Sequence, residues 1–354
     1  MIKFKLEEKF RDRLSSFISS DLFVNQGSYS KSEYWKYHSD LISYKLKGSF
    51  LYLTGNSGNY IPDRKYSFQF YLRSLKIIIK KILRLDTAGP DSWFFLSYKK
   101  AFNKIMSENR IAGFQQIKFN KNQVLFQNFS KCKKKFPFNK FTLNDHIIRS
   151  YYYINILSSY LDFKKNLTIL EIGAGNGNLI SLIKSHLGAK CILNIDLPET
   201  LVLCITFLKD LFPNLKFLLP HEINSKIDQK KLDDFDFIFL TPKQINLIDE
   251  NSIDLSINTS SFHEMTKPQI EEYIKLIQKI SKNNSLFFNT NSVEKIPHDG
   301  NKQEDEYKKR KVIIPNRFFE YPFFNNEILI YQICRFTNFV QHIPFYLRLE
   351  KIKK

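Results

Sequence analysis

The second half of the chain contains short apolar runs that lack the polar alternation of a half-exposed strand. They span residues 167–172, 191–195, 235–240 and 253–257. Such runs are typical of strands buried on both faces of a parallel sheet. Apolar residues recur at helical spacing between the runs, over 179–187, 201–211 and 270–277. This alternation predicts an α/β fold with a parallel sheet.

Local signals place the boundaries of this fold. The segment 142–145 has the spacing of a capping box and predicts a helix that continues to Leu161, so we place a domain boundary near residue 140. Residues 214–219 also qualify as the third strand, but 235–240 is longer and more apolar. We therefore favour 235–240 and treat 213–234 as an excursion from the sheet.

The remaining elements lie at the two ends of the chain. Residues 285–288 are predicted as a fifth strand, and 312–336 contains two extended stretches that suit a terminal hairpin. Residues 1–140 show helical stretches, interrupted by a loop over 48–62. The sequence thus predicts a mainly helical N-terminal region, residues 1–140, before a second domain, residues 141–354.

A glycine-rich loop follows the first apolar run. Gly173, Gly175 and Gly177 lack a Cβ atom, so the loop can adopt unusual backbone angles and let a ligand approach the main chain. Asp196 closes the second run, where a carboxylate can accept hydrogen bonds from both hydroxyls of a ribose. The combination predicts a site for a nucleoside cofactor.

The spacing of the glycines separates two kinds of cofactor. Nicotinamide dinucleotide sites follow GxGxxG and face a pyrophosphate with a helix N-terminus. This chain has GxGxG, with Asn178 in place of the distant glycine, and Glu171 adds a negative charge at the strand end. A sulfonium cation that bears an amino group suits this charge better than a diphosphate. We therefore favour S-adenosyl-L-methionine, with dinucleotide binding or a purely structural turn as alternatives.

The cofactor contacts are assigned along this pattern. The expected residues are Glu171, Gly173, Ala174, Gly175, Gly177, Asp196, Leu197, Gln244 and Asn258. The three glycines and Ala174 would offer their main chain, and Glu171 would serve the amino-acid end. Leu197 would flank the adenine. Gln244 would read the adenine edge, and Asn258 would contact the methionine end.

The charge of the chain is concentrated outside this predicted domain. The formal net charge is +19 over 354 residues, and residues 1–150 hold 28 basic against 11 acidic residues. Contributors are a predicted amphipathic helix over 70–86 and the basic run 131–135. The positive field would attract an anionic glycan, a glycolipid at a membrane surface or a nucleic acid. The alternative is a solvated basic helix face without a partner.

Other features bound the class of protein. No apolar run approaches the roughly 18 residues of a membrane span, and acids at Glu7 and Glu8 argue against a secretion signal, so we expect a cytoplasmic protein. The cysteines lie far apart without a CxxC pair, at Cys132, Cys191, Cys204 and Cys334. This spacing argues against zinc and against a disulfide scaffold. Cys191 and Cys204 are predicted as core residues.

Five segments resemble the sugar O-methyltransferases of bacteria, within the Rossmann-like S-adenosylmethionine-dependent methyltransferases. They are residues 151–157, 170–178, 196–200, 258–265 and 316–322. The glycine motif is evidence for the class, whereas the tyrosine-rich segment 151–157 and the segment 258–265 are more specific to the family. The resemblance implies a seven-stranded sheet whose last strand pair is antiparallel. It also implies a sugar hydroxyl as the methyl acceptor.

A sugar hydroxyl is a poor nucleophile while it is protonated, so a general base would help the transfer. His263 and Glu264 follow the fourth strand at its carboxyl end, where ligands bind in open α/β sheets. We favour His263 because a histidine is mostly neutral at cytoplasmic pH. A capping or packing role is the alternative. Arg317 and Tyr321 are candidate substrate contacts, with a core or hairpin role as the more frequent alternative, and no cluster suggests a metal site.

Three classes of function remain open at this point. The favoured one is methylation of a sugar hydroxyl in a surface glycan or its precursor, carried by a sugar nucleotide or a glycolipid. The second is methylation of RNA or protein, with the basic N-terminal region as the surface that binds the substrate. The fourth strand lacks the Asp/Asn-Pro-Pro-aromatic motif of many N-methylating enzymes, and this argues against nucleic acid as a partner. The third is a binding protein that retains the fold without catalysis.

Overall fold

The computed structural model describes residues 2–24, 43–54, 145–162, 166–295, 316–334 and 345–354. Its centre is a sheet with the strand order β12-β13-β9-β8-β4-β5-β7-β6. The strands are β4 (Thr168–Ile172), β5 (Cys191–Ile195), β6 (Phe217–Leu218), β7 (Phe237–Leu240), β8 (Ile253–Thr259), β9 (Ser281–Ser292), β12 (Glu327–Ile333) and β13 (Phe345–Lys351). Neighbouring strands from β9 to β6 are parallel, and β13 is antiparallel to both β9 and β12. The predicted α/β class and the mainly parallel, Rossmann-like sheet are confirmed.

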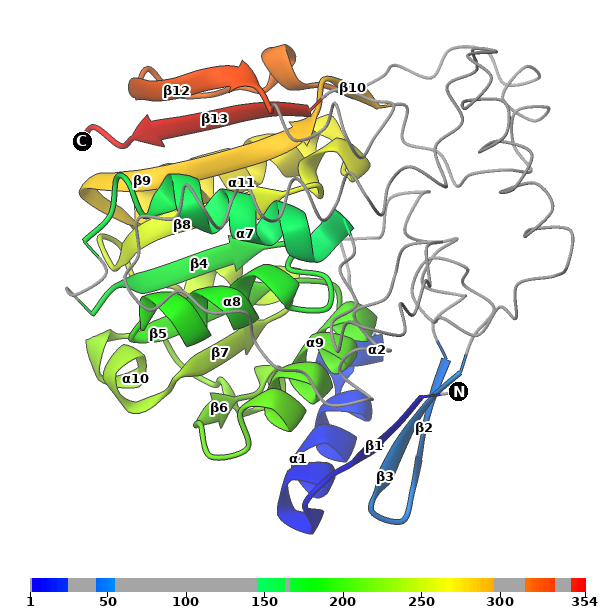
Figure 1. The fold of residues 1–354 in the computed structure, drawn as a ribbon. Coiled ribbons are helices and arrows are strands. Elements are labelled where there is room, and N and C mark those ends of the chain that lie inside the picture. The colour runs from blue at the N-terminus through cyan, green and yellow to red at the C-terminus, as the bar shows by residue number, and fades with distance from the viewer. Residues whose placement is uncertain (1, 25–42, 55–144, 163–165, 296–315, 335–344) are drawn as a thin grey trace, which may run out of the picture.

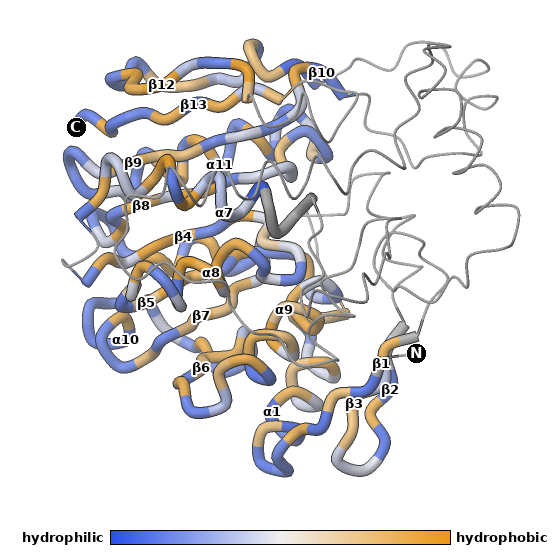
Figure 2. Tube along the Cα trace, in the orientation of Figure 1, coloured by the Kyte–Doolittle hydropathy of each residue, from blue (hydrophilic) through white to orange (hydrophobic). Residues whose placement is uncertain are grey.

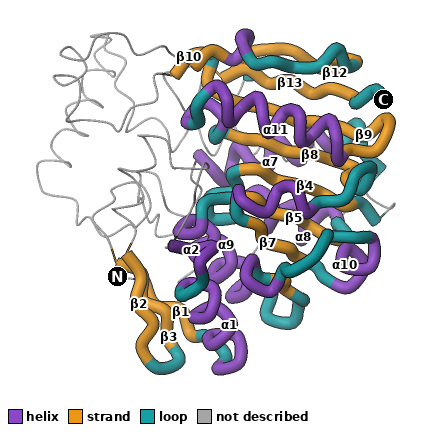
Figure 3. Tube along the Cα trace, turned by 180° about the vertical axis from the view of Figure 1, so that it is seen from behind, coloured by secondary structure: helices purple, strands orange, loops and turns teal. Residues whose placement is uncertain are grey.

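Helices cover both faces of this sheet. On one face lie α7 (Asp145–Leu157), α8 (Asn178–Leu187) and α9 (Pro198–Leu211), and on the other lie α10 (Gln229–Asp234) and α11 (Lys267–Ile280), as Figures 1 and 3 show from opposite sides. Thr266 caps the start of α11, because its N–H donates to Oε1 of Gln269 at 3.0 Å. No helix in the described part of the chain has the length and apolarity needed to cross a membrane.

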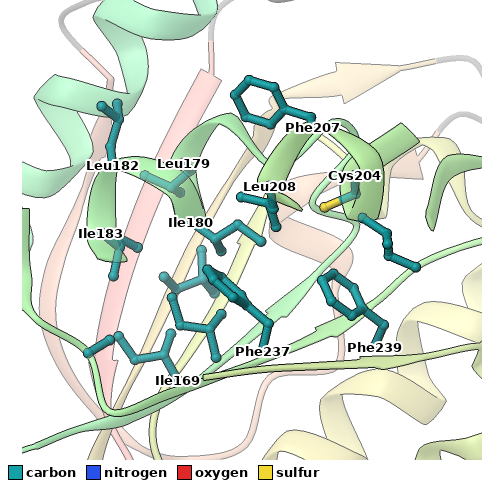
Figure 4. Close-up of a cluster of buried hydrophobic side chains, with 14 of the residues drawn as sticks. Ile169, Leu179, Ile180, Leu182, Ile183, Cys204, Phe207, Leu208, Phe237 and Phe239 are labelled. Atoms are coloured by element: carbon teal, nitrogen blue, oxygen red, sulfur yellow. The ribbon is translucent and has the colours of Figure 1, made fainter. Parts of the chain in front are cut away.

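The alternation of side chains along the strands divides the core into two layers. Ile169 packs with α8 and α9, whereas Leu170 packs on the α11 side. Figure 2 shows hydrophobic residues along the central strands and on α9, and Figure 4 shows how Phe237 and Phe239 pack against residues of α8 and α9. Complete burial on both faces explains why these strands lack polar alternation. Cys191 and Cys204 are buried, as predicted.

Three sequence predictions for this sheet are corrected by the structure. The excursion 213–234 contains β6, which extends the sheet at its edge beyond β7, so the described sheet has one strand more than the seven that the resemblance implies. A strand of two residues is too short to leave a periodic pattern. The fifth strand, β9, is much longer than 285–288. The terminal hairpin joins β12 to β13, so its second strand lies beyond 312–336.

The described part of the N-terminal region is also different from the prediction. It contains α1 (Glu8–Ile18) and α2 (Asp21–Val24), but also a three-stranded antiparallel sheet of β1 (Ile2–Lys5), β2 (Ser43–Lys47) and β3 (Phe50–Thr54). Gly48 has a φ of +56° in the turn between β2 and β3, so the predicted loop over 48–62 begins as a hairpin. Residues 55–144, with the predicted helix 70–86, the basic run 131–135, Cys132 and the expected boundary near 140, lie outside the described residues.

The N-terminal segment is attached to the β6 edge of the large sheet. Phe10 of α1 meets Phe217 edge to face, with 5.9 Å between the ring centroids. Arg13 donates from Nε and Nη2 to the two carboxylate oxygens of Glu222, at 2.5 and 2.7 Å. Its Nη2 also donates to the carbonyl oxygen of Phe217. A bidentate arginine fixes orientation as well as contact, so the small sheet is held beside the large one.

Candidate functional site

The predicted functional residues lie at the carboxyl ends of three adjacent parallel strands, β4, β5 and β8. Glu171 is opposite Asn194 of β5 and Ile257 of β8, and the next residue of β4, Ile172, is opposite Asn258. The side chain of Glu171 points to the α8 face, because it alternates with the buried Leu170 and Ile172 of the other layer. The three strand ends therefore bring residues from distant parts of the sequence to one place.

The glycine loop has the backbone that its composition predicts. Gly173, Gly175 and Gly177 have φ values of +77°, +60° and +84°. A Cβ atom on Gly173 would lie 2.2 Å from Oγ of Ser261, and one on Gly177 would lie 2.9 Å from Sγ of Cys204. Gly173 and Gly177 are thus required by close packing as well as by backbone angle, whereas Gly175 has open space around it.

Asp196 connects the end of β5 to this loop. Its Oδ2 accepts a hydrogen bond from the N–H of Gly175 at 2.9 Å, and its Oδ1 accepts one from the N–H of Leu197 at 2.7 Å. Burial raises the pKa of Asp196 to about 7, although both N–H groups favour the charged form, and the charge of Glu264 adds to the rise. Asp196 therefore sets the shape of the loop and brings a proton-accepting carboxyl to it.

Glu171 is the second buried carboxyl of the site. Its side chain is 1 % exposed, and Oε2 has no hydrogen-bond partner among the described residues. Burial raises its pKa to about 8, and the charge of Asp196 contributes. Asn176 Nδ2, Asn194 Oδ1 and Thr200 Oγ1 are likewise buried without a partner in the described structure. Buried polar atoms are nearly always paired in native proteins, so this cluster indicates a polar ligand.

Asn258 holds the loop after β8 against the glycine loop. Its Nδ2 donates to the carbonyl oxygen of Ile172 at 2.9 Å and to Oγ of Ser261 at 2.6 Å. Its Oδ1 accepts hydrogen bonds from the Phe262 N–H and from Nδ2 of Asn291. The amide is thus fully engaged within the protein and organises the two loops.

The side-chain amide of Gln244 also makes hydrogen bonds within the protein. Its Oε1 accepts from the Thr241 N–H at 3.1 Å, and its Nε2 donates to the carbonyl oxygen of Pro220 at 2.8 Å. These bonds cap the short helix that follows β7 and use one of the two Nε2 hydrogens, so the adenine contact of Gln244 stays a prediction. Leu197 and Ala174 are partly exposed. Their contacts with the cofactor stay predictions.

His263 lies in the short 3₁₀ helix Phe262–Glu264 after β8 and is 3 % exposed. Its Nδ1 accepts a hydrogen bond from the Ser292 N–H at 3.0 Å. In the neutral ring the proton is then on Nε2, which lies 3.5 Å from Oε1 of Glu264. Burial and the Lys295 ammonium lower the pKa of His263 to about 4. The ring is neutral, as expected, but neither nitrogen offers a lone pair to a substrate.

Glu264 is paired with Lys295, whose Nζ lies 2.6 Å from Oε1. Burial alone would raise the pKa of Glu264, but Lys295 and His263 outweigh it and lower the pKa to about 2. Both contacts go to Oε1, and the described residues provide no hydrogen bond to Oε2. Glu264 therefore presents an ionised carboxylate with one oxygen available.

Arg317 and Tyr321 line a separate surface cavity of about 170 Å³ beside the start of α11. Nε of Arg317 lies 2.7 Å from a carboxylate oxygen of Glu294, and Nη1 lies 3.2 Å from one of Glu320. Tyr321 is buried and packs edge to face on Phe262. No residue of the glycine loop lines this cavity, so the structure does not bring Arg317 and Tyr321 together with the strand-end carboxyls.

Comparisons with known proteins complete this description. No protein-family model matches the chain, and no curated protein matches it. Among solved structures, the chain is similar to an S-adenosylmethionine-dependent methyltransferase from Methanosarcina mazei, with 14% identity over 56% of this chain and 97% of that chain and a TM-score of 0.34. The phosphoethanolamine N-methyltransferase 2 of Haemonchus contortus, solved with S-adenosylhomocysteine, is 11% identical over 57% and 52% of the two chains, with a TM-score of 0.35. The chain that was solved with the Trm112 methyltransferase activator of Haloferax volcanii is 13% identical over 58% and 90%, with a TM-score of 0.36.

Four residues of this region were not identified from the sequence. Ser261 fills the space that Gly173 leaves, and Asn291 links Asn258 to the end of β9. Lys295 pairs with Glu264, and Arg149 of α7 donates to Oγ of Ser260 at 3.3 Å. Two of them lie in or next to segments that carry the family resemblance: Ser261 is within 258–265, and Arg149 precedes 151–157. Asn291 and Lys295 are brought in by tertiary contacts that no local pattern records.

Proposed function

We propose that this chain is an S-adenosylmethionine-dependent methyltransferase. The observation that carries the proposal is the pair of buried carboxyls, Glu171 and Asp196, at adjacent strand ends beside a loop of three glycines with positive φ. Two such groups raise each other's cost of ionisation, and a cation is the ligand that would relieve it. A diphosphate would add further negative charge at the same place.

The chain's residues fit this cofactor in a specific way. When bound, S-adenosylmethionine supplies an electrophilic methyl group on a sulfonium centre. Glu171 would hold the amino-acid end, and Asp196, which already accepts from the loop, would accept the ribose hydroxyls. The glycines would let the cofactor approach the main chain, with Leu197 beside the adenine. Holding donor and acceptor in line is the main catalytic task in such a transfer.

The affinity for S-adenosylmethionine is expected to rise with pH between about 6 and 8. A cation favours the ionised carboxyl, so a Glu171 with a pKa of about 8 must release its proton on binding at lower pH. Linkage then gives up to about tenfold in affinity per pH unit for each proton released, and a plateau above pH 8. Calorimetry in buffers of different ionisation enthalpy measures both the affinity and the proton release.

Glu171→Gln should flatten this pH dependence, and Glu250→Gln, at an exposed position, should leave it as in the wild type. An affinity of the wild-type protein that does not change with pH would contradict the assignment of Glu171. A protein that shows no heat of binding with S-adenosylmethionine or S-adenosylhomocysteine would contradict the cofactor itself.

We further propose that the acceptor is a sugar hydroxyl. The proposal is supported by the segments that carry the family resemblance. Two of them, 151–157 and 258–265, belong to α7 and to the loop after β8. The two elements approach each other where Arg149 of α7 donates to Oγ of Ser260 at 3.3 Å. Tyr153 of α7 also lies 3.5 Å from Thr290 of the neighbouring strand β9. The polar groups that contact the Glu264 carboxylate are Lys295 and His263. Glu264 would accept the proton through Oε2, and His263 would act as a positioning residue.

The acceptor proposal is tested by deleting the gene and analysing surface glycans by mass spectrometry. We expect glycans that are lighter by one methyl group per repeat, restored by the wild-type gene and not by an Asp196→Ala gene. Unchanged glycans would contradict the sugar acceptor while leaving the cofactor proposal intact. A loss of methyl groups from RNA or protein in the same strain would favour the second class of function.

A further inference from the structure

Two buried polar side chains lie side by side on neighbouring strands of the large sheet. Glu171 of β4 and Asn194 of β5 are directly opposite each other in the parallel register. Both alternate with residues of the α11 layer, so both side chains point to the face that α8 and α9 cover. Neighbouring strands are about 4.8 Å apart, which brings the carboxyl and the amide within reach of each other.

The thiol of Cys204 on α9 connects this pair to the glycine loop. Nδ2 of Asn194 donates a hydrogen bond to Sγ of Cys204 at 3.1 Å. The same sulfur would lie 2.9 Å from a Cβ atom on Gly177. Burial raises the pKa of the Cys204 thiol, and the charges of Asp196 and Glu171 add to the rise. The carboxyl and the amide are therefore enclosed by the sheet, by α9 and by the end of the glycine loop.

The hydrogen bonds of this group leave two oxygen acceptors without a donor. Oε2 of Glu171 and Oδ1 of Asn194 are both buried and have no hydrogen-bond partner among the described residues. A carboxyl that carries its proton is a donor, and an amide oxygen is an acceptor. Burial raises the pKa of Glu171 to about 8, so the carboxyl carries this proton at neutral pH. A single proton on Glu171 can therefore satisfy both atoms.

The surroundings of Glu171 favour Asn194 as the acceptor of this proton. Asp196, whose charge acts on Glu171, already accepts a main-chain N–H on each of its oxygens. The residue opposite Glu171 on β8 is Ile257, and the first turn of α8 contains no ionisable residue. Oγ1 of Thr200 on α9 is also buried without a partner in the described structure, but it is not part of the sheet register.

We propose that Asn194 is a positioning residue, whose Oδ1 accepts a hydrogen bond from the protonated Glu171 and fixes the direction of that carboxyl. In the cofactor-free protein the bond satisfies both buried groups. When the cation binds, the proton leaves Glu171 for the solvent and the positive charge takes its place. This last step rests on the proposed function, whereas the hydrogen bond between the two side chains does not.

The test is infrared spectroscopy of the full chain without cofactor at about pH 6, where Glu171 is protonated. The C=O stretch of Glu171 is the band that disappears in Glu171→Gln. A carboxyl that donates a hydrogen bond absorbs at a lower wavenumber than a free one, so we expect the wild-type band at the lower position. Asn194→Leu removes the acceptor and should shift the band to higher wavenumber.

The matched control is Thr200→Val, which removes another buried oxygen of the same region and should leave the band in place. The proposal is overturned if Thr200→Val shifts the band and Asn194→Leu does not. It is also overturned if the wild-type band already lies at the position of a free carboxyl, and this result needs no folded Asn194→Leu protein.

A double-mutant cycle in denaturant unfolding at the same pH gives a second measurement. Asn194→Leu alone leaves a buried donor unpaired and should raise the unfolding equilibrium constant about tenfold. Glu171→Met/Asn194→Leu removes both partners, so its effect should be about tenfold smaller than the product of the two single effects. Effects that simply multiply would contradict the hydrogen bond. Both measurements use cofactor-free protein, so they leave the proposed function untouched, and calorimetry with S-adenosylmethionine tests that function separately.

Discussion

Gly173→Ala is expected to abolish binding of S-adenosylmethionine and to lower the free energy of unfolding by about 3 kcal/mol. The new Cβ would lie 2.2 Å from Oγ and 2.4 Å from Cβ of Ser261. Overpacking of this kind costs about 1–3 kcal/mol, and the φ of +77° adds about 1–2 kcal/mol for a residue with a Cβ. Denaturant unfolding measures the stability, and calorimetry measures the binding.

A double-mutant cycle separates the two causes. In a Ser261→Gly background the clash is removed, so Gly173→Ala should cost only the backbone strain, about 1 kcal/mol. Gly188→Ala is the control outside the site, because Gly188 has a φ of +64° with open space around it. If Gly173→Ala lowered the free energy of unfolding no more than Gly188→Ala does, the close contact between the glycine loop and Ser261 would be contradicted.

Glu264→Gln should reduce kcat by about 10²–10⁴, the usual contribution of a general base, with the affinity for S-adenosylmethionine within about twofold of wild type. The substitution keeps the size of the side chain and removes the only carboxylate with an available oxygen in the loop after β8. Transfer of a labelled methyl group to a glycan extract measures kcat. Unfolding is measured in parallel, because Lys295 loses the charge of its partner.

Two further variants serve as comparisons for Glu264→Gln. Glu320→Gln breaks a comparable carboxylate–lysine pair, 2.8 Å from Lys267, away from the strand ends, and should leave kcat unchanged. His263→Asn keeps an acceptor for the Ser292 N–H and should cost about tenfold, as expected of a positioning residue. At saturating S-adenosylmethionine, the pH profile of kcat should lack an inflection near 6.5 from His263, since burial keeps its ring neutral. A Glu264→Gln variant with full kcat would refute the assigned role.

Much of the parallel sheet could be predicted because each strand buried on both faces needs apolar residues at most of its positions. This constraint is local, so the sequence shows it directly in 167–172 and 191–195. The failures have a different cause. β6 contributes only two residues to the sheet. The N-terminal strands β1, β2 and β3 have only four or five residues each, so the period of their hydrophobic positions is hard to distinguish from that of a helix. β13 was missed because its partner β12 precedes it by a long connection, and strand pairing is not a local property.

The candidate site divides in the same way. The glycines and Asp196 are tied to strand ends and backbone angles, so their places follow from the chain itself. The state of His263 depends on the Ser292 N–H and on Lys295, which come from β9 and the segment after it. No pattern around residue 263 contains that information. The proposal of Glu264 rather than His263 as the proton acceptor therefore rests on three-dimensional contacts.

The contact between Gly173 and Ser261 also limits how such a protein can be redesigned. Exchanging Ser261 for a larger residue to reshape the proposed acceptor side would displace the glycine loop proposed to bind the donor, so the two proposed specificities would not vary independently there. Met265 takes no part in this contact, and Lys295 is needed as the partner of Glu264. Libraries aimed at new acceptors should diversify Met265 and leave the serine fixed.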